Sequence, residues 1–320
     1  MPVVAASRHR WSLAPDGHPR PDAPFGRGPL AARVLGRVID GAAHVGSRVP
    51  TSVTSPLAVV GGTAEWALRG TKRRRLAENL GHAIGAPQRS GEVRHLVRAE
   101  VVNESRRSAD LLWAMGKPEE FLATVDVVGA EHPHAALARG HGVVLAGIHL
   151  GGWEVAAAVP AAILPTRTSV IVADNWLAWA IQHVRVAAGL GVVYRSASPL
   201  HALRLLSRGE ALLIFGDDAS GAPPRLHVVP FCDAYAGLPA GVVSLARMSG
   251  APIVPYFVIP IGPRRWRVVI EPAIDPPARR GGEAAEREVL AALAGRWTLA
   301  IRAQPDQWAA SFPIAWRSTP

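Results

Sequence analysis

The sequence lacks several features that mark common classes of protein. Cysteine occurs once in 320 residues, at Cys232, so an internal disulfide framework is excluded and a reducing cytoplasm is the fitting compartment. No apolar run approaches the roughly 20 residues that a membrane-spanning helix needs. The beginning of the chain carries Arg8 and Arg10 and then prolines instead of an apolar segment, so we expect no signal peptide.

Several catalytic motifs are missing as well. There is no HExxH sequence, and His132, His134 and His141 precede a predicted strand in a polar segment, which argues against a metal hydrolase. No Gly-x-Ser-x-Gly sequence marks a serine hydrolase. Gly151-Gly152 has the spacing of neither a phosphate-binding P-loop nor a dinucleotide-binding loop. We therefore expect neither a metal ion nor a bound cofactor.

Charge is unevenly distributed along the chain. The net charge is +10, and residues 1–110 contain 17 Lys and Arg against 9 Asp and Glu, a net charge of +8 in that part alone. One interpretation is an arginine-rich solvated surface, and another is a face held against anionic lipid headgroups. Nucleic acid binding is disfavoured, because the sequence has no recognition-helix motif, no zinc-ligand spacing and no aromatic RNA-binding motif.

The first part of the chain is predicted to be a tail followed by helices. Residues 1–27 are rich in Pro, Arg and Gly, and we expect them to be disordered. Residues 28–120 are predicted to be helical, basic and membrane-facing. In a helix that begins at Leu30, apolar residues recur four apart at Val34 and Val38, so this helix either lies in a membrane interface or packs on the domain. Further helices are predicted at Arg73–Leu80 and Glu92–Met115.

The second part of the chain alternates strand and helix. Residues 121–317 are therefore predicted to form an α/β core with a mostly parallel central sheet flanked by helices, and residues 28–317 to form one compact unit. The strand candidates are continuously apolar, which favours burial on both faces. The predicted strands are Val125–Val128, Gly142–Ile148, Thr168–Val172, Val192–Tyr194, Ala211–Phe215, Ile253–Ile259 and Trp266–Ile270. The predicted helices are Val155–Ile163, Asn175–Ala188, Pro199–Arg208, Pro239–Ser249 and Glu283–Arg302.

The most informative stretch runs from His149 to Glu154. The apolar residues Val143–Ala146 predict a buried strand that ends just before His149, and two glycines and a helix follow. The ordinary pKa of histidine suits proton transfer near neutral pH, and a carboxylate five positions on can orient the imidazole and stabilise its charged form. Gly151 and Gly152 would let backbone or substrate approach closely. From this spacing alone, a catalytic and a purely structural role for His149 both stay open.

Other polar residues follow predicted strands. Ligands of open parallel sheets bind at the carboxyl ends of the strands, and Asp174 and Asp217 both lie just after apolar runs. On the predicted helix after Asp174, Leu177, Ile181 and Arg185 form one row four residues apart, so the arginine either faces an active cleft or reaches solvent. A planar guanidinium suits bidentate binding of phosphate.

The order of these motifs resembles that of the bacterial lipid A lauroyl/myristoyl acyltransferases. This family belongs to the lysophospholipid acyltransferase superfamily and includes the phosphatidylinositol mannoside acyltransferases. His149-Leu-Gly-Gly-Trp-Glu154 is similar to the family's His-Phe-Gly-Asn-Trp-Glu, with Leu150 in place of Phe and Gly152 in place of Asn. The resemblance covers about residues 70–317. Further segments similar to family motifs are Asn79-Leu80 after a basic run, Phe231-Cys232-Asp233 in place of Phe-Phe-Gly, Gly250–Pro255 and Gln304–Trp308.

The resemblance implies a glycerolipid-acyltransferase-like fold and a reaction. A fatty acyl chain would move from acyl-CoA or acyl carrier protein to a hydroxyl of a membrane glycolipid. His149 would be the general base, oriented by Glu154. Arg185 would hold a phosphate of the acceptor, and Asp217 would position Arg185 or the acceptor. Backbone N–H groups around Gly151 would stabilise the oxyanion.

The resemblance also implies a place in the cell. We expect a peripheral protein on the cytoplasmic face of the inner membrane, in contact with anionic lipid. Lipid A acyltransferases usually carry an N-terminal spanning helix, which this sequence does not show, so a phosphatidylinositol mannoside or another glycolipid is favoured as acceptor. The alternative is a catalytically degenerate, peripheral lipid-binding protein, in which His149, Glu154, Arg185 and Asp217 would not converge in one groove.

Overall fold

The computed structural model describes residues 29–175, 178, 181–220 and 225–319. The tail predicted at residues 1–27 lies outside this part of the chain. None of the helices in the described part is long and apolar enough to cross a bilayer. The helices are α1 (Pro29–Gly46), α2 (Thr51–Leu68), α3 (Gly70–Ile84), α4 (Gly91–Gly116), α5 (Pro118–Ala123), α6 (Glu131–Leu137), α7 (Trp153–Ala156), α8 (Val159–Ile163), α10 (Gln182–Ala187), α11 (Pro199–Ser207), α12 (Gly241–Ser249), α13 (Gly282–Ala303) and the short 3-10 helix η2 (Pro305–Gln307). The strands are β1 (Val125–Val128), β2 (Val143–Gly147), β3 (Thr168–Val172), β4 (Leu190–Tyr194), β5 (Ala211–Phe215), β6 (Leu226–Phe231), β7 (Ala234–Pro239), β8 (Ile253–Gly262), β9 (Arg265–Ile270) and β10 (Ala315–Arg317).

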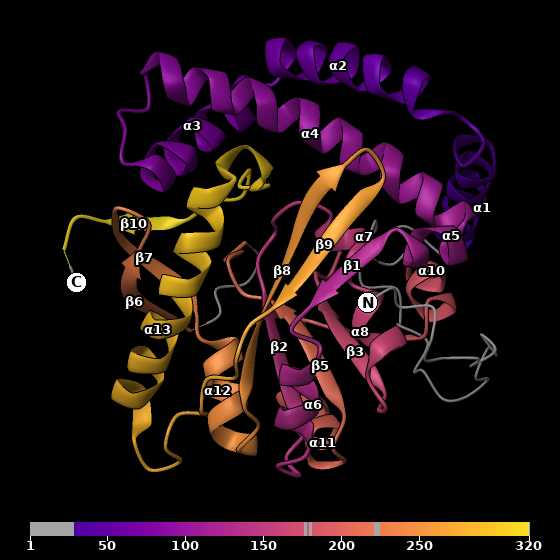
Figure 1. Cartoon of the computed structure of the whole chain (residues 1–320). Coiled ribbons are helices and arrows are strands. Elements are labelled where there is room, and N and C mark those ends of the chain that lie inside the picture. Colours follow the sequence, from indigo (N-terminus) through magenta and orange to yellow (C-terminus); the bar gives the residue numbers. More distant parts are fainter. Residues whose placement is uncertain (1–28, 176–177, 179–180, 221–224, 320) are drawn as a thin grey trace.

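Seven strands form the central sheet in the order β1-β9-β8-β2-β5-β3-β4 (Figure 1). Among these strands β8 and β9 are antiparallel to each other, and the other neighbouring pairs are parallel. The predicted α/β class with a mostly parallel sheet is therefore confirmed. At the centre of the sheet β2 and β5 are neighbours, with Gly147 opposite Phe215, so the segments that follow these two strands emerge next to each other.

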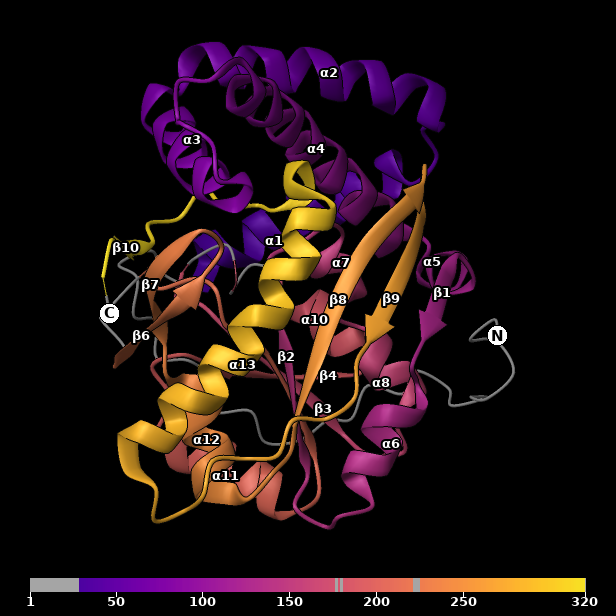
Figure 2. The ribbon, with the colours of Figure 1, turned by 60° about the vertical axis from the view of Figure 1, so that its left-hand side comes forward.

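The central strands are apolar on both sides because helices cover both faces of the sheet. All five residues of β2 are buried. Val144 belongs to a core shared with α12 and α13, whereas its neighbour Leu145 belongs to a second core shared with α7 and α8. Figure 2 shows α13 lying along the first of these faces. This helix contributes Leu293, Trp297 and Ile301, which are spaced four residues apart, to that core.

Helices α2, α3 and α4 lie across one end of the sheet (Figures 1 and 2). α2 is continuous through Gly61-Gly62, although glycine disfavours the interior of a helix. A Cβ atom on Gly62 would lie 2.7 Å from the Cα atom of Val102 in α4. The glycine is therefore needed for the close approach of the two helices, and it does not interrupt α2.

Two other segments differ from the sequence prediction. The single helix predicted after Glu154 is divided into α7 and α8, because Pro160 has no N–H group to donate to the carbonyl of Ala156. That carbonyl accepts a hydrogen bond of 2.6 Å from the Tyr256 hydroxyl instead. Residues 226–239, which were not predicted to be strands, form the β6–β7 hairpin, and β10 completes a small antiparallel sheet with it.

Candidate active site

His149 and Asp217 meet where two adjacent strands end. β2 ends at Gly147 and β5 ends at Phe215, and each of the two side chains belongs to the second residue after its strand. The distance between His149 Nδ1 and Asp217 Oδ1 is 2.7 Å. The parallel pairing of β2 and β5 therefore joins two predicted site residues that are far apart in the sequence.

Asp217 is fully buried and accepts hydrogen bonds at both carboxylate oxygens. The backbone N–H of His149 lies 3.2 Å from Oδ1 and 3.1 Å from Oδ2. The indole N–H of Trp308 donates to Oδ2 at 2.9 Å. Because an ionised carboxylate can only accept, the imidazole donates its Nδ1 hydrogen to Asp217 and keeps a lone pair on Nε2. The carboxylate thus selects the tautomer of His149 in which Nε2 can act as a base.

The pKa of His149 reflects burial and nearby acids acting in opposite directions. Burial of the imidazole lowers the pKa, but the negative charge and the hydrogen bond of Asp217 raise it, and Asp218 and Glu154 add smaller effects of the same sign. The result is a pKa above the ordinary value of histidine. The side chain remains 17% exposed, so it is not closed off from a substrate.

The carboxylate that holds His149 is Asp217 and not Glu154, which corrects the sequence prediction. Glu154 Oε1 instead accepts a hydrogen bond of 2.5 Å from Arg185 Nη2. Asp217 was predicted to position Arg185 or the acceptor, and the first of these contacts is replaced by the Glu154–Arg185 pair. Arg185 lies on α10, the regular part of the helix predicted at residues 175–188, and some of that range lies outside the described residues.

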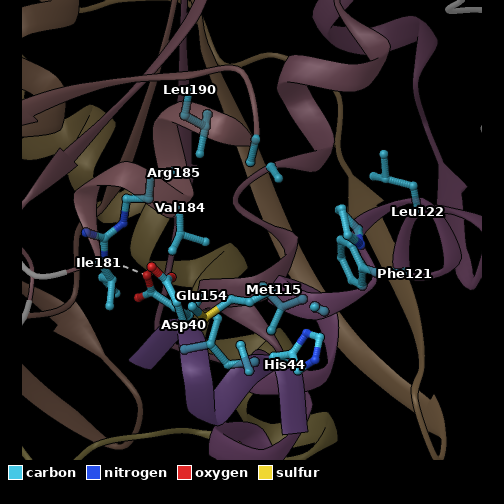
Figure 3. A pocket seen from close by; sticks show the side chains of 18 residues that line it. Asp40, His44, Met115, Phe121, Leu122, Glu154, Ile181, Val184, Arg185 and Leu190 are labelled. Atoms are coloured by element: carbon cyan, nitrogen blue, oxygen red, sulfur yellow. Dashed lines mark hydrogen bonds and ion pairs between the residues drawn. The ribbon is translucent and has the colours of Figure 1, made fainter. Parts of the chain in front are cut away.

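A mostly apolar cavity of about 350 Å³ lies beside the Glu154–Arg185 pair (Figure 3). Its walls come from α1, α4, α5, α7 and α10 and from residues next to these helices. Met115, Phe121 and Ile181 are among the apolar side chains around it (Figure 3). The cavity therefore combines room for a hydrocarbon chain with an arginine–carboxylate pair in its wall.

The two glycines of the turn are required by their surroundings. Gly151 has a φ of +57°, and a Cβ atom on it would lie 2.2 Å from the carbonyl oxygen of Val258. Its N–H group donates to the carbonyl of Gln307 at 2.9 Å and is therefore not free for an oxyanion. An oxyanion site made by the other N–H groups around Gly151 stays a prediction. A Cβ atom on Gly152 would lie 2.6 Å from Nε1 of Trp266. Substrate binding by these glycines stays a prediction.

The C-terminal segment supplies contacts that the sequence analysis missed. Besides the bond from Trp308 to Asp217, the N–H of Ala309 donates to the carbonyl of His149 at 2.8 Å. The ring of Phe312 lies 5.3 Å from the imidazole. The side chain of Asn79 donates to the carbonyl of Phe312 at 3.0 Å and so ties this segment to α3. The motif around Trp308 resembled the family pattern, but nothing in its sequence indicated which residue it would contact.

Other candidate residues lie outside this arrangement. Asp174 accepts a hydrogen bond of 2.8 Å from the backbone N–H of Ser196. Burial raises the pKa of the Cys232 thiol to about 12, which makes it a poor nucleophile. In the described part of the chain, no group of three or more His, Cys, Asp or Glu side chains is placed to hold a metal ion.

The sequence and the structure were compared with those of known proteins. The sequence model of the bacterial lipid A biosynthesis acyltransferase family matches residues 43–310, a range that contains all of the predicted site residues. A search of curated proteins finds no match. Among solved structures, the chain is similar to the 1-acyl-sn-glycerophosphate (LPA) acyltransferase PlsC from Thermotoga maritima, with 13% identity, a TM-score of 0.36, and coverage of 80% of this chain and 99% of that one. The family match spans most of the chain, which therefore belongs to the bacterial lipid A biosynthesis acyltransferase family and is an acyltransferase.

Proposed function

We propose that the protein transfers a fatty acyl chain from acyl-CoA or acyl carrier protein to a hydroxyl of a membrane glycolipid, with His149 as the general base. The observation that carries the proposal is the 2.7 Å contact between His149 Nδ1 and the buried Asp217 carboxylate. This contact keeps the Nε2 lone pair available for a proton. Asp217, and not Glu154, is the residue that orients the base.

The proposed reaction needs no covalent acyl-enzyme, because a thioester is already activated. Nε2 of His149 takes the proton of the acceptor hydroxyl as its oxygen attacks the thioester carbonyl. The new C–O bond forms and the C–S bond breaks, and the imidazolium returns the proton to the leaving thiolate. The Asp217 carboxylate stabilises the imidazolium in between, in the same way that it raises the pKa of His149 against the effect of burial.

Glu154 and Arg185 are proposed to bind substrate. A guanidinium held by the Glu154 carboxylate and by the backbone carbonyl of Ala178 presents its remaining donors in a fixed plane, which suits a phosphate of the acceptor or of the donor carrier. The apolar cavity next to the pair is proposed to take an acyl chain. Glu154 also adds a small effect to the raised pKa of His149.

We propose a peripheral location on the cytoplasmic face of the inner membrane. α1 and α2 expose apolar side chains to solvent, among them Val38 at 61%, Leu57 at 62% and Val60 at 66%. Leu57 and Val60 are three residues apart and therefore lie on one face of α2. Exposed apolar side chains on helices within the basic part of the chain, residues 1–110, favour contact with an anionic membrane surface.

The test is lipid mass spectrometry on the native host. A strain from which the gene has been deleted is complemented with the wild type or with His149→Ala. We expect one defined lipid to lose an acyl chain in the deletion strain and to regain it with the wild type alone, since loss of a general base reduces transfer by about 10²–10⁴. The mass of that lipid names the acceptor and separates lipid A from phosphatidylinositol mannosides.

The same experiment decides between transfer and lipid binding alone. Restoration of the lipid by both proteins would make His149 structural. Equal levels of folded protein, measured by immunoblot and by thermal unfolding of the purified variants, are the control. An unchanged lipid profile in the deletion strain would favour the alternative of a catalytically degenerate lipid-binding protein.

A further inference from the structure

A second cavity borders the turn between β2 and α7 that follows His149. The proposed reaction assigns no role to this cavity. Its volume is about 360 Å³, and it is enclosed by the first turn of α2, the middle of α4, the tip of the β8–β9 hairpin and η2. Polar or charged residues make up nine of its 16 lining residues, alongside glycines, prolines, an alanine and a tryptophan. The backbone of Gly151 and Gly152 forms part of its wall.

Three arginines line this cavity and bring positive charge to it. Arg106 and Arg107 come from α4, and Arg264 comes from the β8–β9 turn. The acid in the lining is Asp110. Burial raises the pKa of Asp110 to about 6, although Arg264 and Arg106 act in the opposite direction, so near neutral pH its charge offsets one guanidinium charge. Glu100, whose pKa is about 7, offsets part of the charge of Arg107, with which it pairs.

Each guanidinium is held in place before any ligand arrives. Arg106 Nη1 donates to the side-chain oxygen of Asn103 at 3.1 Å. Arg107 Nη2 donates to the buried Glu100 carboxylate at 2.7 Å, and burial raises the pKa of Glu100 to about 7. Arg264 donates to a backbone carbonyl at 2.7 Å and lies over an indole ring. Fixed donors lose little conformational freedom when they bind, which favours binding.

The opposite wall adds donors of the same kind. Thr51, Thr54 and Ser55 line the cavity, and all three belong to the first turns of the 18-residue helix α2. Their hydroxyls can donate, and the positive end of the helix dipole lies at this point. Arginines, hydroxyls and a helix N-terminus around one cavity are the elements of a phosphate site.

The position of the cavity favours a phosphate that is attached to a lipid. Thr54 and Ser55 face the cavity, while Val53 and Leu57 of the same helix turns are exposed, Leu57 by 62%. A lipid whose chains contact the exposed face of α2 would place its headgroup near the cavity mouth. An occupant would also contact the backbone of Gly151 and Gly152, next to His149 in the sequence.

We propose that this cavity is a second binding site of the protein, specific for a phosphate group and separate from the Glu154–Arg185 pair. The proposed acyl transfer does not use this site. A test of phosphate binding here is therefore independent of a test of acyl transfer. The phosphate belongs either to an anionic lipid headgroup or to a free phosphate compound, and the experiment below has one arm for each source.

The first arm measures equilibrium binding of inorganic phosphate to the full chain by isothermal titration calorimetry. Arg106→Gln is expected to weaken binding by about tenfold or more, since a hydrogen bond to a charged group is lost. Arg94→Gln is the matched control, because Arg94 lies on the same helix outside the cavity and carries the same charge. Arg185→Gln is expected to leave this binding in place. Equal affinities for Arg106→Gln and Arg94→Gln, together with equal sedimentation in the second arm, overturn the proposal.

The second arm measures sedimentation with phosphatidylcholine vesicles, with and without phosphatidic acid. A loss of binding to the anionic vesicles that is larger for Arg106→Gln than for Arg94→Gln assigns the phosphate to a lipid headgroup. If the two variants sediment alike but differ in the calorimeter, the phosphate belongs to a free compound. If they agree in both arms, the cavity is not a phosphate site. Melting temperatures of both variants near that of the wild type exclude unfolding as the cause of a difference.

Discussion

Asp217→Asn separates the geometry of the site from its charge. Asp217 Oδ1 faces His149 Nδ1 at 2.7 Å, and Oδ2 faces Trp308 Nε1 at 2.9 Å. An asparagine can place its oxygen on only one side. With the oxygen toward His149, its NH₂ group would face the indole N–H, and two donors would oppose each other in a buried site. We therefore expect the oxygen to turn toward Trp308 and the NH₂ group toward the imidazole.

This orientation inactivates the base. An NH₂ donor facing Nδ1 requires the tautomer with its hydrogen on Nε2, so His149 can no longer accept a proton there. A wrong tautomer of the catalytic histidine costs up to about 10⁴ in rate in serine protease triads, and we expect a loss of transfer of about 10²–10⁴ here. The pKa of His149 should also fall, because burial lowers it and the opposing charge of Asp217 is gone.

The assay is initial-rate transfer to the lipid identified by mass spectrometry, measured against pH. In the wild type the rate should rise with pH through the raised pKa of His149, since only the neutral imidazole accepts a proton. In Asp217→Asn the residual rate should level off at a lower pH. Adding Trp308→Phe removes the indole donor, and Asp217→Asn should cost less in that background than in the wild type. Full activity of folded Asp217→Asn would refute the mechanism.

Two further predictions concern the helices across the end of the sheet. Gly62→Ala should lower the free energy of unfolding by about 1–3 kcal/mol in urea titrations, because its Cβ would lie 2.7 Å from Cα of Val102, whereas Gly61→Ala, with its nearest neighbour at 3.8 Å, should be neutral or stabilising. A neutral Gly62→Ala would mean that α2 and α4 can separate without loss. Leu57→Glu should reduce sedimentation with anionic vesicles, and Leu299→Glu, equally exposed on α13, should not. Equal effects of the two glutamates would argue against α2 as the membrane-facing element.

The architecture of the core could be predicted because strands that are buried on both faces have continuously apolar sequences. β2 and β5 are apolar at every position, and each is followed within two residues by a polar group. The rule that ligands meet at the carboxyl ends of parallel strands then selects His149 and Asp217, together with Asp174, which contacts Ser196 instead. What the rule does not give is the order of strands in the sheet. Without knowing that β5 is the neighbour of β2, the nearer acid in the sequence, Glu154, was the natural partner for the histidine.

The remaining differences also arise from contacts between distant segments. A pair of glycines such as Gly61-Gly62 usually favours a break in a helix. The role of Gly62 in helix packing becomes apparent only from the position of Val102, which lies against it. The helix predicted at Val155–Ile163 contains Pro160, which cannot donate to the carbonyl of Ala156. In the structure the hydroxyl of Tyr256 donates to that carbonyl instead. Trp308 is fully buried against Asp217, a contact between residues 91 positions apart. Local periodicity predicts elements well, and it carries no information about such pairs.

The contact of Trp308 with Asp217 has a consequence for the order in which the protein is made. β2, β5 and the residues that follow them leave the ribosome long before Pro305–Gln307 and Trp308 do. Until then the carbonyl of His149 has no Ala309 amide to bond and Asp217 lacks its indole donor. A nascent chain can therefore complete most of its sheet while its reaction centre is still unfinished, and synthesis of the segment that contains Trp308 and Ala309 brings the acyltransferase site into its final form.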